Sequence, residues 1–371
     1  MSRRYDVAIV GAGIAGASLA AELAGQVSVL ILEAESQAGY HSTGRSAAFW
    51  SETYGGPLIQ PLTSASGAFL AAPPADFAEA PLLSPRGALH VAEAGGEAAL
   101  NALATEFAGS DIPLRPLDRA ALKAVLPGLK AGWTRALAEP SCADIDVAGL
   151  HAAYLKRART RGAALITDAA LRRAKRSGGR WTIESAAGAF EAGILVNAAG
   201  AWADEVARRS SVAPLGIQPH RRTIVQVRVE PPARPELPLV IDAEGRFYFK
   251  PEVGGRLWLS PHDETPSEPC DCAPEEIDVA LAIDGLERIV DWRVAAVERR
   301  WAGLRSFAPD RLPVYGFAEP GFFWCAGQGG FGIQTAPAAA KLAAGLLLGS
   351  PPDELVAHID PAPYSPARFA N

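Results

Sequence analysis

The chain lacks the features that mark several protein classes. Cysteine occurs only four times in 371 residues, too sparsely for the disulfide framework of a small secreted protein. Basic residues are not in excess, and a formal net charge of −6 argues against a nucleic-acid partner, which requires a basic surface. No apolar run approaches the roughly 20 residues that a transmembrane helix needs. These absences leave a globular protein, which we expect in the cytoplasm.

Two of the cysteines, Cys270 and Cys272, lie close together in a PCDC segment. Paired thiolates are common zinc ligands, but a zinc site needs further cysteines or histidines at suitable spacing. No second pair completes the pattern in this sequence. We therefore predict no metal site and interpret the two cysteines as loop residues, with metal binding as the alternative.

The N-terminal segment has the pattern of a dinucleotide-binding unit. A β-branched run at 5–10 precedes Gly11, Gly13 and Gly16, and a second apolar run ends at Glu33. The first glycine allows a tight turn, the second lets the backbone approach a pyrophosphate, and the third lets helix and strand pack closely. Glu33, 20 residues after Gly13, is placed to accept hydrogen bonds from an adenosine ribose. The pattern predicts a dinucleotide at the helix N-terminus; a purely structural strand–helix–strand unit is the alternative.

The next segment separates two kinds of dinucleotide. Residues 39–50, GYHSTGRSAAFW, place hydroxyl side chains and Arg45 directly before Phe49 and Trp50. Such a loop suits an anion, and the aromatic residues after it indicate that the ligand continues into an apolar cavity. We therefore interpret it as a loop around the flavin side of FAD rather than part of an NAD site. A generic loop of the same composition is the alternative.

The remaining segments predict a mixed fold of two domains, as the length also suggests at about 100–200 residues per domain. The first domain is continued by a capped helix at 144–162, a strand at 164–167, a strand and helix within 191–207, and a glycine turn before a helix that begins near Thr335. Residues 220 to 305 differ in character, with alternating or aromatic strands separated by Pro- and Gly-rich turns, which is typical of an antiparallel sheet. A helix at 275–292 interrupts this region.

Seven short motifs follow one another along the chain: GAGIAG, HSTGRSAA, NAAGAW (197–202), PHRRT (219–223), FYFKP (247–251), WAGLRSF (301–307) and GGFGIQT (329–335). Together they resemble the D-amino-acid oxidase/glycine oxidase superfamily of flavoproteins, over nearly the whole chain. Within it the similarity is greatest to the bacterial D-arginine dehydrogenase type. The resemblance implies an α/β fold with a Rossmann-like FAD-binding domain (1–84, 143–219 and 306–371) and a second, antiparallel-sheet (α+β) substrate domain (85–142 and 220–305).

The resemblance also implies non-covalent FAD and oxidation of a D-amino acid, by hydride transfer from Cα to flavin N5, to a 2-oxo acid and ammonia. Arg222 and Arg305 match the arginines that hold the substrate carboxylate, for which guanidinium forks are well suited. Tyr54 and Tyr248 match aromatic and hydroxyl groups around the substrate. Structural ion pairs and core tyrosines are the alternatives for these four residues.

Further residues are assigned by the same resemblance. The substrate pocket is expected to include Phe49, Ser51, Ala88 and Gly332. The FAD site is expected to include Gly11, Gly13, Ile14, Ala15, Gly16, Glu33, Ala34, His41, Ser42, Thr43, Arg45, Ser46, Ala47, Ala48, Ala170, Ala199, Gly200, Trp202, Arg305, Gly329, Gly330, Phe331, Gly332, Ile333 and Gln334.

Three departures from the relatives bear on specificity. D-Arginine dehydrogenases have a glutamate where this chain has Ala88 and a histidine where it has Phe49, so a basic substrate side chain loses its charge partner. We therefore expect neutral or apolar D-amino acids to be preferred. Sarcosine oxidases have a lysine near the flavin where this chain has Trp258, which favours a dehydrogenase over an oxidase.

Other activities stay open at this point. The same arginines would hold glycine, sarcosine, another secondary amine or a 2-hydroxy acid, and a non-catalytic flavin-binding subunit is an alternative of another class. The expected partner is a small amino-acid substrate. The sequence does not define the electron acceptor or the oligomeric state.

Overall fold

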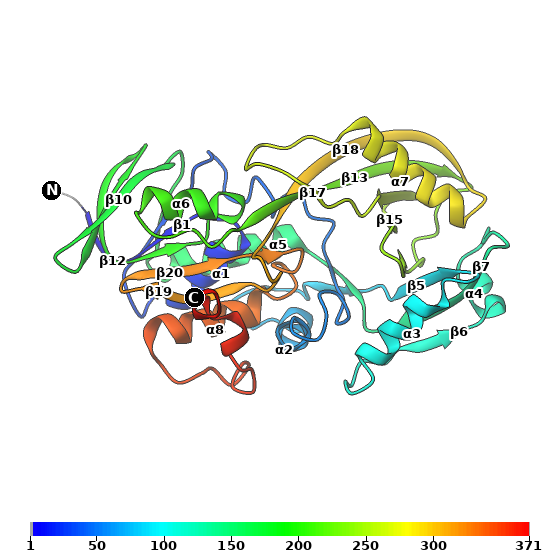
Figure 1. Ribbon diagram of the computed structural model, residues 1–371, viewed down its shortest axis with the longest axis horizontal. Helices are drawn as coiled ribbons and strands as arrows, with labels where there is room; N and C mark the ends of the chain where they lie inside the picture. Colours follow the sequence, from blue (N-terminus) through cyan, green and yellow to red (C-terminus); the bar gives the residue numbers. More distant parts are fainter. Residues whose placement is uncertain (1–2, 371) are drawn as a thin grey trace.

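The computed structural model describes residues 3–370 and has two lobes along its longest axis (Figure 1). Among these residues the strands form sheets of eight, ten and three strands. The first lobe, on the left in Figure 1, contains the eight-stranded sheet and both ends of the described chain, and the second lobe contains the ten-stranded sheet.

The sheet of the first lobe brings the carboxyl ends of its parallel strands to one edge. Strand β1 (Arg3–Val10) pairs in parallel with β2 (Val29–Leu32) and β12 (Gly188–Asn197). Beyond β2 lies β9 (Ala164–Ile166), also parallel. On the other side an antiparallel meander joins β12, β11 (Arg180–Ser185) and β10 (Leu171–Ser177), and the hairpin of β19 (Val314–Glu319) and β20 (Phe322–Ala326) pairs with the end of β12. Ligands of open α/β sheets bind at such an edge.

Both faces of this sheet are covered, which explains its continuous apolar strands. Val7 and Ile9 of β1 pack into a cluster with the helices α1 (Ile14–Leu23), α5 (Val147–Thr160) and α8 (Ala336–Leu348). The alternate residues Ala8 and Val10 pack on the opposite face with α6 (Ala203–Arg209), which follows the 3-10 turn Gly200–Trp202.

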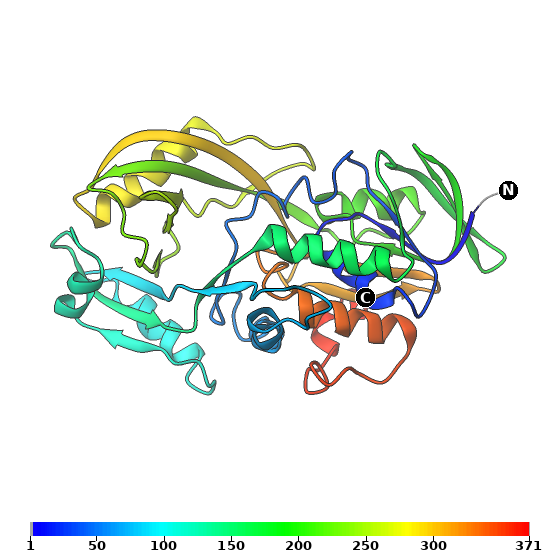
Figure 2. The same cartoon turned by 180° about the vertical axis from the view of Figure 1, so that it is seen from behind.

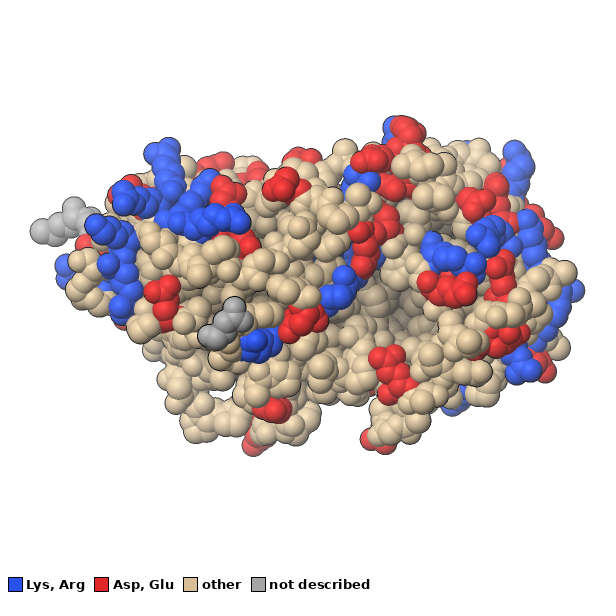
Figure 3. Space-filling view, in the orientation of Figure 1, with Lys and Arg blue, Asp and Glu red and all other residues tan. Residues whose placement is uncertain are grey.

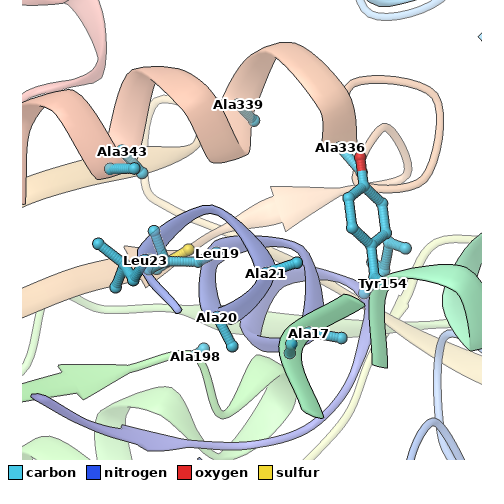
Figure 4. Packing of buried hydrophobic residues seen from close by; sticks show 14 of the residues in the cluster. Ala17, Leu19, Ala20, Ala21, Leu23, Tyr154, Ala198, Ala336, Ala339 and Ala343 are labelled. Carbon is cyan, nitrogen blue, oxygen red and sulfur yellow. The ribbon is translucent and has the colours of Figure 1, made fainter. Parts of the chain in front are cut away.

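Helices α1 and α8 contribute many alanines to one buried cluster. Figure 4 shows Ala17 and Ala21 of α1 and Ala336, Ala339 and Ala343 of α8 in this cluster. The predicted helix starts are confirmed: α8 begins directly after Thr335. The predicted cap of α5 is also confirmed, since the Asp146 side chain accepts a hydrogen bond of 2.8 Å from the backbone N–H of Gly149.

The sheet of the second lobe is built around two long strands. β13 (Gln218–Glu230) and β18 (Arg293–Phe307) pair antiparallel over most of their length and run from this lobe into the first (Figure 1). The order continues through β16 (Arg256–Ser260), β15 (Tyr248–Glu252), β14 (Leu239–Asp242), β5 (Ala88–Glu93), β7 (Trp133–Glu139) and β6 (Arg115–Leu117), with β21 (Gln328–Gly329) beside β18 and β17 (Thr265–Pro266) beside β13. Its helices are α3 (Glu97–Glu106), α4 (Arg119–Val125) and α7 (Glu276–Ile289).

One pair in this sheet differs from the antiparallel arrangement expected from the sequence. β14 and β5 are parallel. They are far apart in the chain, so no tight turn forces them to run in opposite directions. Their pairing joins the two sequence segments that make up the second lobe.

The connection between the lobes is short and partly sheet-like. β3 (Phe49–Trp50) and β4 (Leu83–Pro85) both pair with β8 (Ala143–Ile145), and α2 (Gln60–Ala71) lies between β3 and β4 in the chain. Figure 2 shows the chain leaving the second lobe at this point and entering α5. Two 3-10 turns, Ala362–Tyr364 and Pro366–Phe369, end the described chain. The domain boundaries given above stay a prediction.

Among the described residues, no helix combines the length and the apolar character needed to span a bilayer. The same residues contain no cluster of three or more His, Cys, Asp or Glu side chains that could hold a metal ion.

Candidate active site

A cavity of about 450 Å³ runs from the glycine turn after β1 to aromatic residues of the second lobe. Its walls come from the predicted segments around Gly11, residues 39–49, Ala199 and Gly330, and from the strands β13, β15 and β18. Figure 3 shows a hollow between the lobes on one face of the molecule, with acidic and basic side chains beside it. The cavity therefore has a nucleotide end in the first lobe and a substrate end at the junction with the second.

The glycine turn leaves no space for side chains. Gly11 has a φ of +102°, and a Cβ at this position would lie 2.5 Å from the carbonyl oxygen of Ala198. A Cβ on Gly16 would lie 1.9 Å from the carbonyl oxygen of Gly11. Gly16 does not line the cavity, and its contribution is this close packing of α1 on the turn.

Glu33 lines the cavity at the end of β2, where its carboxylate also holds the glycine turn. Oε2 accepts a hydrogen bond of 2.8 Å from the backbone N–H of Ala12, and Oε1 accepts one of 3.0 Å from that of Glu35. Each carboxylate oxygen has a second lone pair, so the predicted bond to a ribose stays compatible with these contacts.

The loop of residues 39–48 lines the cavity, but its polar side chains bind protein groups rather than pointing free into it. The Ser42 hydroxyl donates to the carbonyl of Leu304, the Thr43 hydroxyl accepts from the N–H of Ile14, and the Ser46 hydroxyl accepts from the N–H of Ala48. Arg45 contacts Asp271 and donates to two backbone carbonyls of the second lobe. The bonds of Ser42 and Arg45 tie the loop to the second lobe, while the Thr43 and Ser46 hydroxyls, which accept in these bonds, keep an O–H to donate, so the predicted contact of this loop with FAD stays a prediction.

The other walls of the nucleotide end come from segments far apart in the chain. Ala170, Ala199, Gly200 and Trp202 line the cavity, and the Trp202 ring lies 4.5 Å from that of His41. On the opposite side the lining residues include Gly329, Gly330, Gly332, Ile333 and Gln334. Phe331 of the same motif does not line the cavity, because its ring packs on Tyr54 and Phe307.

At the substrate end the two predicted arginines come together. Arg222 and Arg305 both line the cavity and both contact Oε1 of Glu264, at 3.5 and 3.1 Å. Arg305 also donates to the Tyr54 hydroxyl, and the Arg222 guanidinium lies 5.9 Å from the centre of the Tyr248 ring. Burial lowers the pKa of Arg305 below its usual value and raises the pKa of Tyr248.

Apolar and aromatic groups complete this end. The Phe49 ring lies 5.4 Å from that of Tyr54 and 6.0 Å from that of Tyr248. Ile224 and Ile241 also line it, although sequence reasoning did not identify them. Both lie on strands whose neighbours became known only with the sheet register.

His262 was also missed, and it lies two residues after the end of β16. It lines the cavity with a φ of +54°, and its ring packs edge-on against Tyr248 at 5.6 Å. Burial, together with the positive charges of Arg222 and Arg305, lowers its pKa to about 3. The ring is therefore neutral near pH 7. The only sequence signal was a histidine at the end of a strand.

Two residues predicted for the substrate pocket lie behind its wall. Ala88 is buried in an apolar cluster with Ile224 and Tyr248 but does not line the cavity. Ser51 is fully buried, and its hydroxyl donates to Glu139 at 3.0 Å. Both residues are buried behind the side chains that line the cavity, whereas we expected them to contact the substrate directly. Trp258 likewise packs against Lys250 and Trp301 and is absent from the cavity wall.

Glu139 organises a buried polar network next to the pocket. Its fully buried carboxylate accepts hydrogen bonds from Ser51, from the Thr53 hydroxyl at 2.7 Å and from the N–H of Glu52 at 2.8 Å, and lies 3.1 Å from His90 Nε2. Burial raises its pKa, but the His90 ring and the hydroxyl donors outweigh burial and hold the pKa below its ordinary value. The network fixes the segment between Phe49 and Tyr54.

The residues around the cavity fit a bound FAD. The turn at Gly11 allows a pyrophosphate to approach the backbone. Glu33 and the aromatic residues of the substrate end line one continuous cavity. At the substrate end the guanidinium groups of Arg222 and Arg305 line the cavity beside the ring of Tyr248.

Comparison with known proteins agrees with this geometry. A family model described as "DAO: FAD dependent oxidoreductase" matches residues 6–346. Glycine oxidase of Geobacillus kaustophilus is 25% identical over 388 residues, which cover 99% of this chain and 98% of that protein. The crystal structure of that glycine oxidase superposes with a TM-score of 0.84 and covers 98% of both chains.

Other relatives match over a smaller part or at lower identity. Dimethylglycine dehydrogenase of Homo sapiens is 30% identical over 250 residues, and the match covers 62% of this chain but only 29% of that protein. The chain thus spans less than a third of that relative. L-Proline dehydrogenase from P. horikoshii has a TM-score of 0.83 at 20% identity, which shows the shared fold.

Proposed function

The chain belongs to the DAO family of FAD-dependent oxidoreductases, and on this premise we propose that it oxidises D-amino acids with neutral or apolar side chains to 2-oxo acids and ammonia. Its relatives make it an FAD-dependent oxidoreductase of amines or amino acids. The proposal adds the configuration and the side-chain class of the substrate.

The observation that carries the proposal is the convergence of Arg222 and Arg305 at the apolar end of the cavity. We call these two residues the clamp. Guanidinium groups bind carboxylates with fixed geometry, and the Arg305 bond to Tyr54 orients one of them. A clamped carboxylate would direct Cα toward the nucleotide end, and such positioning is a large part of catalysis.

Bound FAD would supply the redox chemistry by accepting hydride from Cα. The protein then has to bind, orient and exclude water. Phe49, Ile224, Ile241 and Tyr248 surround the position of the substrate side chain with apolar surface. No carboxylate lines this end within residues 3–370, so we infer that the amino group enters neutral; the acidic lining residues, Glu33, Glu35 and Glu205, belong to the nucleotide end.

The same charge distribution supports the preference for uncharged side chains. Glu264, the acidic residue that contacts both clamp arginines, is already paired with them. Two other acidic residues are also engaged: Glu52 accepts from the Ser64 hydroxyl and Glu244 pairs with Arg246. A cationic side chain would therefore lose water without gaining a carboxylate. An unpaired buried charge costs several kcal/mol, and about 3 kcal/mol corresponds to roughly 100-fold in kcat/KM.

The test is a substrate panel with an artificial electron acceptor. We expect D-leucine, D-phenylalanine and D-methionine to exceed D-arginine in kcat/KM by about 100-fold, and each to exceed its L-enantiomer. A best rate with glycine, sarcosine or a 2-hydroxy acid would instead support the second candidate, which the full-length similarity to a glycine oxidase favours.

Anaerobic bleaching of the flavin by the best substrate distinguishes an enzyme from a non-catalytic flavin subunit. Acid precipitation tests the attachment of FAD. We expect the flavin to be released into the supernatant, because the binding is proposed to be non-covalent.

A further inference from the structure

We propose that Glu264 competes with the substrate carboxylate for the clamp, and that Arg311 holds Glu264 aside when substrate binds. This proposal rests on the proposed function, because it takes Arg222 and Arg305 to be the groups that hold the substrate. According to this proposal, a residue that does not line the cavity controls how tightly the site binds carboxylates.

Glu264 bridges three arginines. Its Oε1 lies 3.1 Å from Arg305 Nη1 and 3.5 Å from Arg222 Nη2, and its Oε2 lies 2.8 Å from Arg311 Nη2. One carboxylate of the protein thus occupies a donor of each clamp residue. The third arginine offers the same carboxylate a partner outside the clamp.

The four side chains form a row from the cavity to the surface. The exposed fraction rises from 8% for Arg222 and 12% for Arg305 to 34% for Glu264 and 50% for Arg311. Glu264 does not line the cavity, so it contacts the clamp from the solvent side. Arg311 lies at the outer end, with its guanidinium 3.9 Å from the centre of the Phe307 ring.

The backbone beside Glu264 is held in place, so only its side chain needs to move. Asp263 accepts the Nε–H of Arg222 through its carbonyl at 2.8 Å and the N–H of Thr223 through its side chain at 2.8 Å. Directly after Glu264, strand β17 pairs with β13. Rotation about the side-chain bonds would move the Glu264 carboxylate away from Arg305 while the contact to Arg311 is kept.

The charges favour competition. Burial raises the pKa of Glu264, but the three guanidiniums outweigh burial and hold the pKa below its ordinary value, so the side chain is an anion near pH 7. An arriving carboxylate has to take over donors that Glu264 uses. Since Arg311 is half exposed, the displaced anion keeps a charge partner and contact with water, which lowers the cost of displacement.

A double-mutant cycle tests the proposal. The holoenzyme is titrated with benzoate, a simple aromatic carboxylate, and Kd is measured from the change in flavin absorption. We expect Glu264→Gln to tighten binding about tenfold and Arg311→Gln to weaken it several-fold. In the Glu264→Gln background, Arg311→Gln should have no further effect, because there is no longer an anion to hold aside.

Two further variants make the outcome decisive. Glu264→Asp keeps the charge but shortens the reach to the clamp, so we expect an intermediate Kd, and this variant decides the matter if Glu264→Gln loses its flavin. Glu275→Gln is the matched control, since Glu275 lies at the other end of the same loop and pairs with Arg221. Its Kd should stay within about twofold of the wild type.

The results separate failure of this proposal from failure of the proposed function. If Arg305→Met abolishes benzoate binding but Glu264→Gln weakens it, Glu264 orders the clamp and the competition is wrong. Independent effects of the Glu264 and Arg311 substitutions would also overturn it. If Arg305→Met leaves the Kd unchanged, the clamp itself lies elsewhere, and both proposals fall.

Discussion

The two ends of the cavity differ in whether backbone or side chains form their walls. The nucleotide end begins at a turn of backbone and glycines, with Gly11 and Gly13 among its walls. The substrate end consists of large side chains, including Arg222, Arg305 and Tyr248, that project from separate strands. The shape of the nucleotide end requires glycines, which have no Cβ atom. The shape of the substrate end depends on the positions of the terminal groups of its side chains.

This difference determines how each end tolerates change. A backbone-lined site fails when a single atom is added, because backbone cannot move aside. A side-chain site fails when a donor or its orientation is lost, and the loss is graded. Substitutions at the nucleotide end should therefore affect FAD content, and those at the substrate end should affect KM and kcat with FAD retained.

The largest effect is expected for Gly16→Ala. The added methyl group would lie 1.9 Å from the Gly11 carbonyl oxygen, so α1 or the glycine turn has to move. We expect loss of most bound FAD and a lower Tm, with overpacking costing about 1–3 kcal/mol or more. The control is Gly132→Ala, where no atom lies within 4 Å of the new Cβ. A Gly16→Ala protein with full flavin content would contradict this view of the nucleotide end.

At the substrate end, Arg222→Met and Arg305→Met should each retain FAD but raise KM steeply and lower kcat. Each loses charge-assisted contacts worth about 1.5–3 kcal/mol, or roughly 10- to 100-fold in kcat/KM. Arg228→Met is the matched control, an exposed arginine on the same strand as Arg222. Near-normal kcat/KM in both clamp variants would place the carboxylate site elsewhere.

The same contrast explains what could be predicted from the sequence. The glycine turn is a local pattern, so its spacing alone identified the strand, the helix and the dinucleotide position. Placing Arg305 near Arg222 depends on the pairing of β13 with β18, in which Arg305 lies opposite His220. Only the family resemblance supplied that information.

The sequence predicted poorly which residues line the cavity and which are buried behind its lining. Ser51 and Ala88 lie on the correct elements but one layer behind the wall, and periodicity does not resolve single layers. The partner of Arg45 in this structure, Asp271, lies 226 residues away in the chain, so the sequence did not indicate this pair. Glu139 and His262 carried no motif at all.

Replacing Glu139 tests whether the substrate end depends on support from behind its wall. Glu139→Ala leaves His90 and the hydroxyls of Ser51 and Thr53 without their acceptor, and leaving a buried donor unsatisfied costs about 1–3 kcal/mol. We expect a lower Tm and a higher KM, because the segment between Phe49 and Tyr54 is no longer fixed.

Glu139→Gln keeps one acceptor oxygen and should recover part of both effects. The readouts are Tm, KM and the flavin-to-protein ratio of the two variants. If KM is normal while Tm falls, Glu139 is structural only and does not position the pocket.

The smallest effect concerns the dependence of stability on pH. His262 has a pKa of about 3 in the fold, against an ordinary value of 6.5, so its folded pKa is depressed. Between these values the unfolded chain binds a proton that the folded chain does not. The free energy of unfolding therefore falls as the pH falls through this window, by about 1.4 kcal/mol per pH unit well below 6.5.

Removing the titrating group isolates this contribution from that of other acids and bases. We expect His262→Asn to lose less stability than the wild type between pH 6.5 and 5, by about 2 kcal/mol, in urea unfolding followed by fluorescence. His358→Asn is the matched control, because His358 is exposed and should follow the wild type. If the wild-type and His262→Asn curves are parallel, His262 is protonated in the fold, and the substrate end is more polar than its apolar walls indicate.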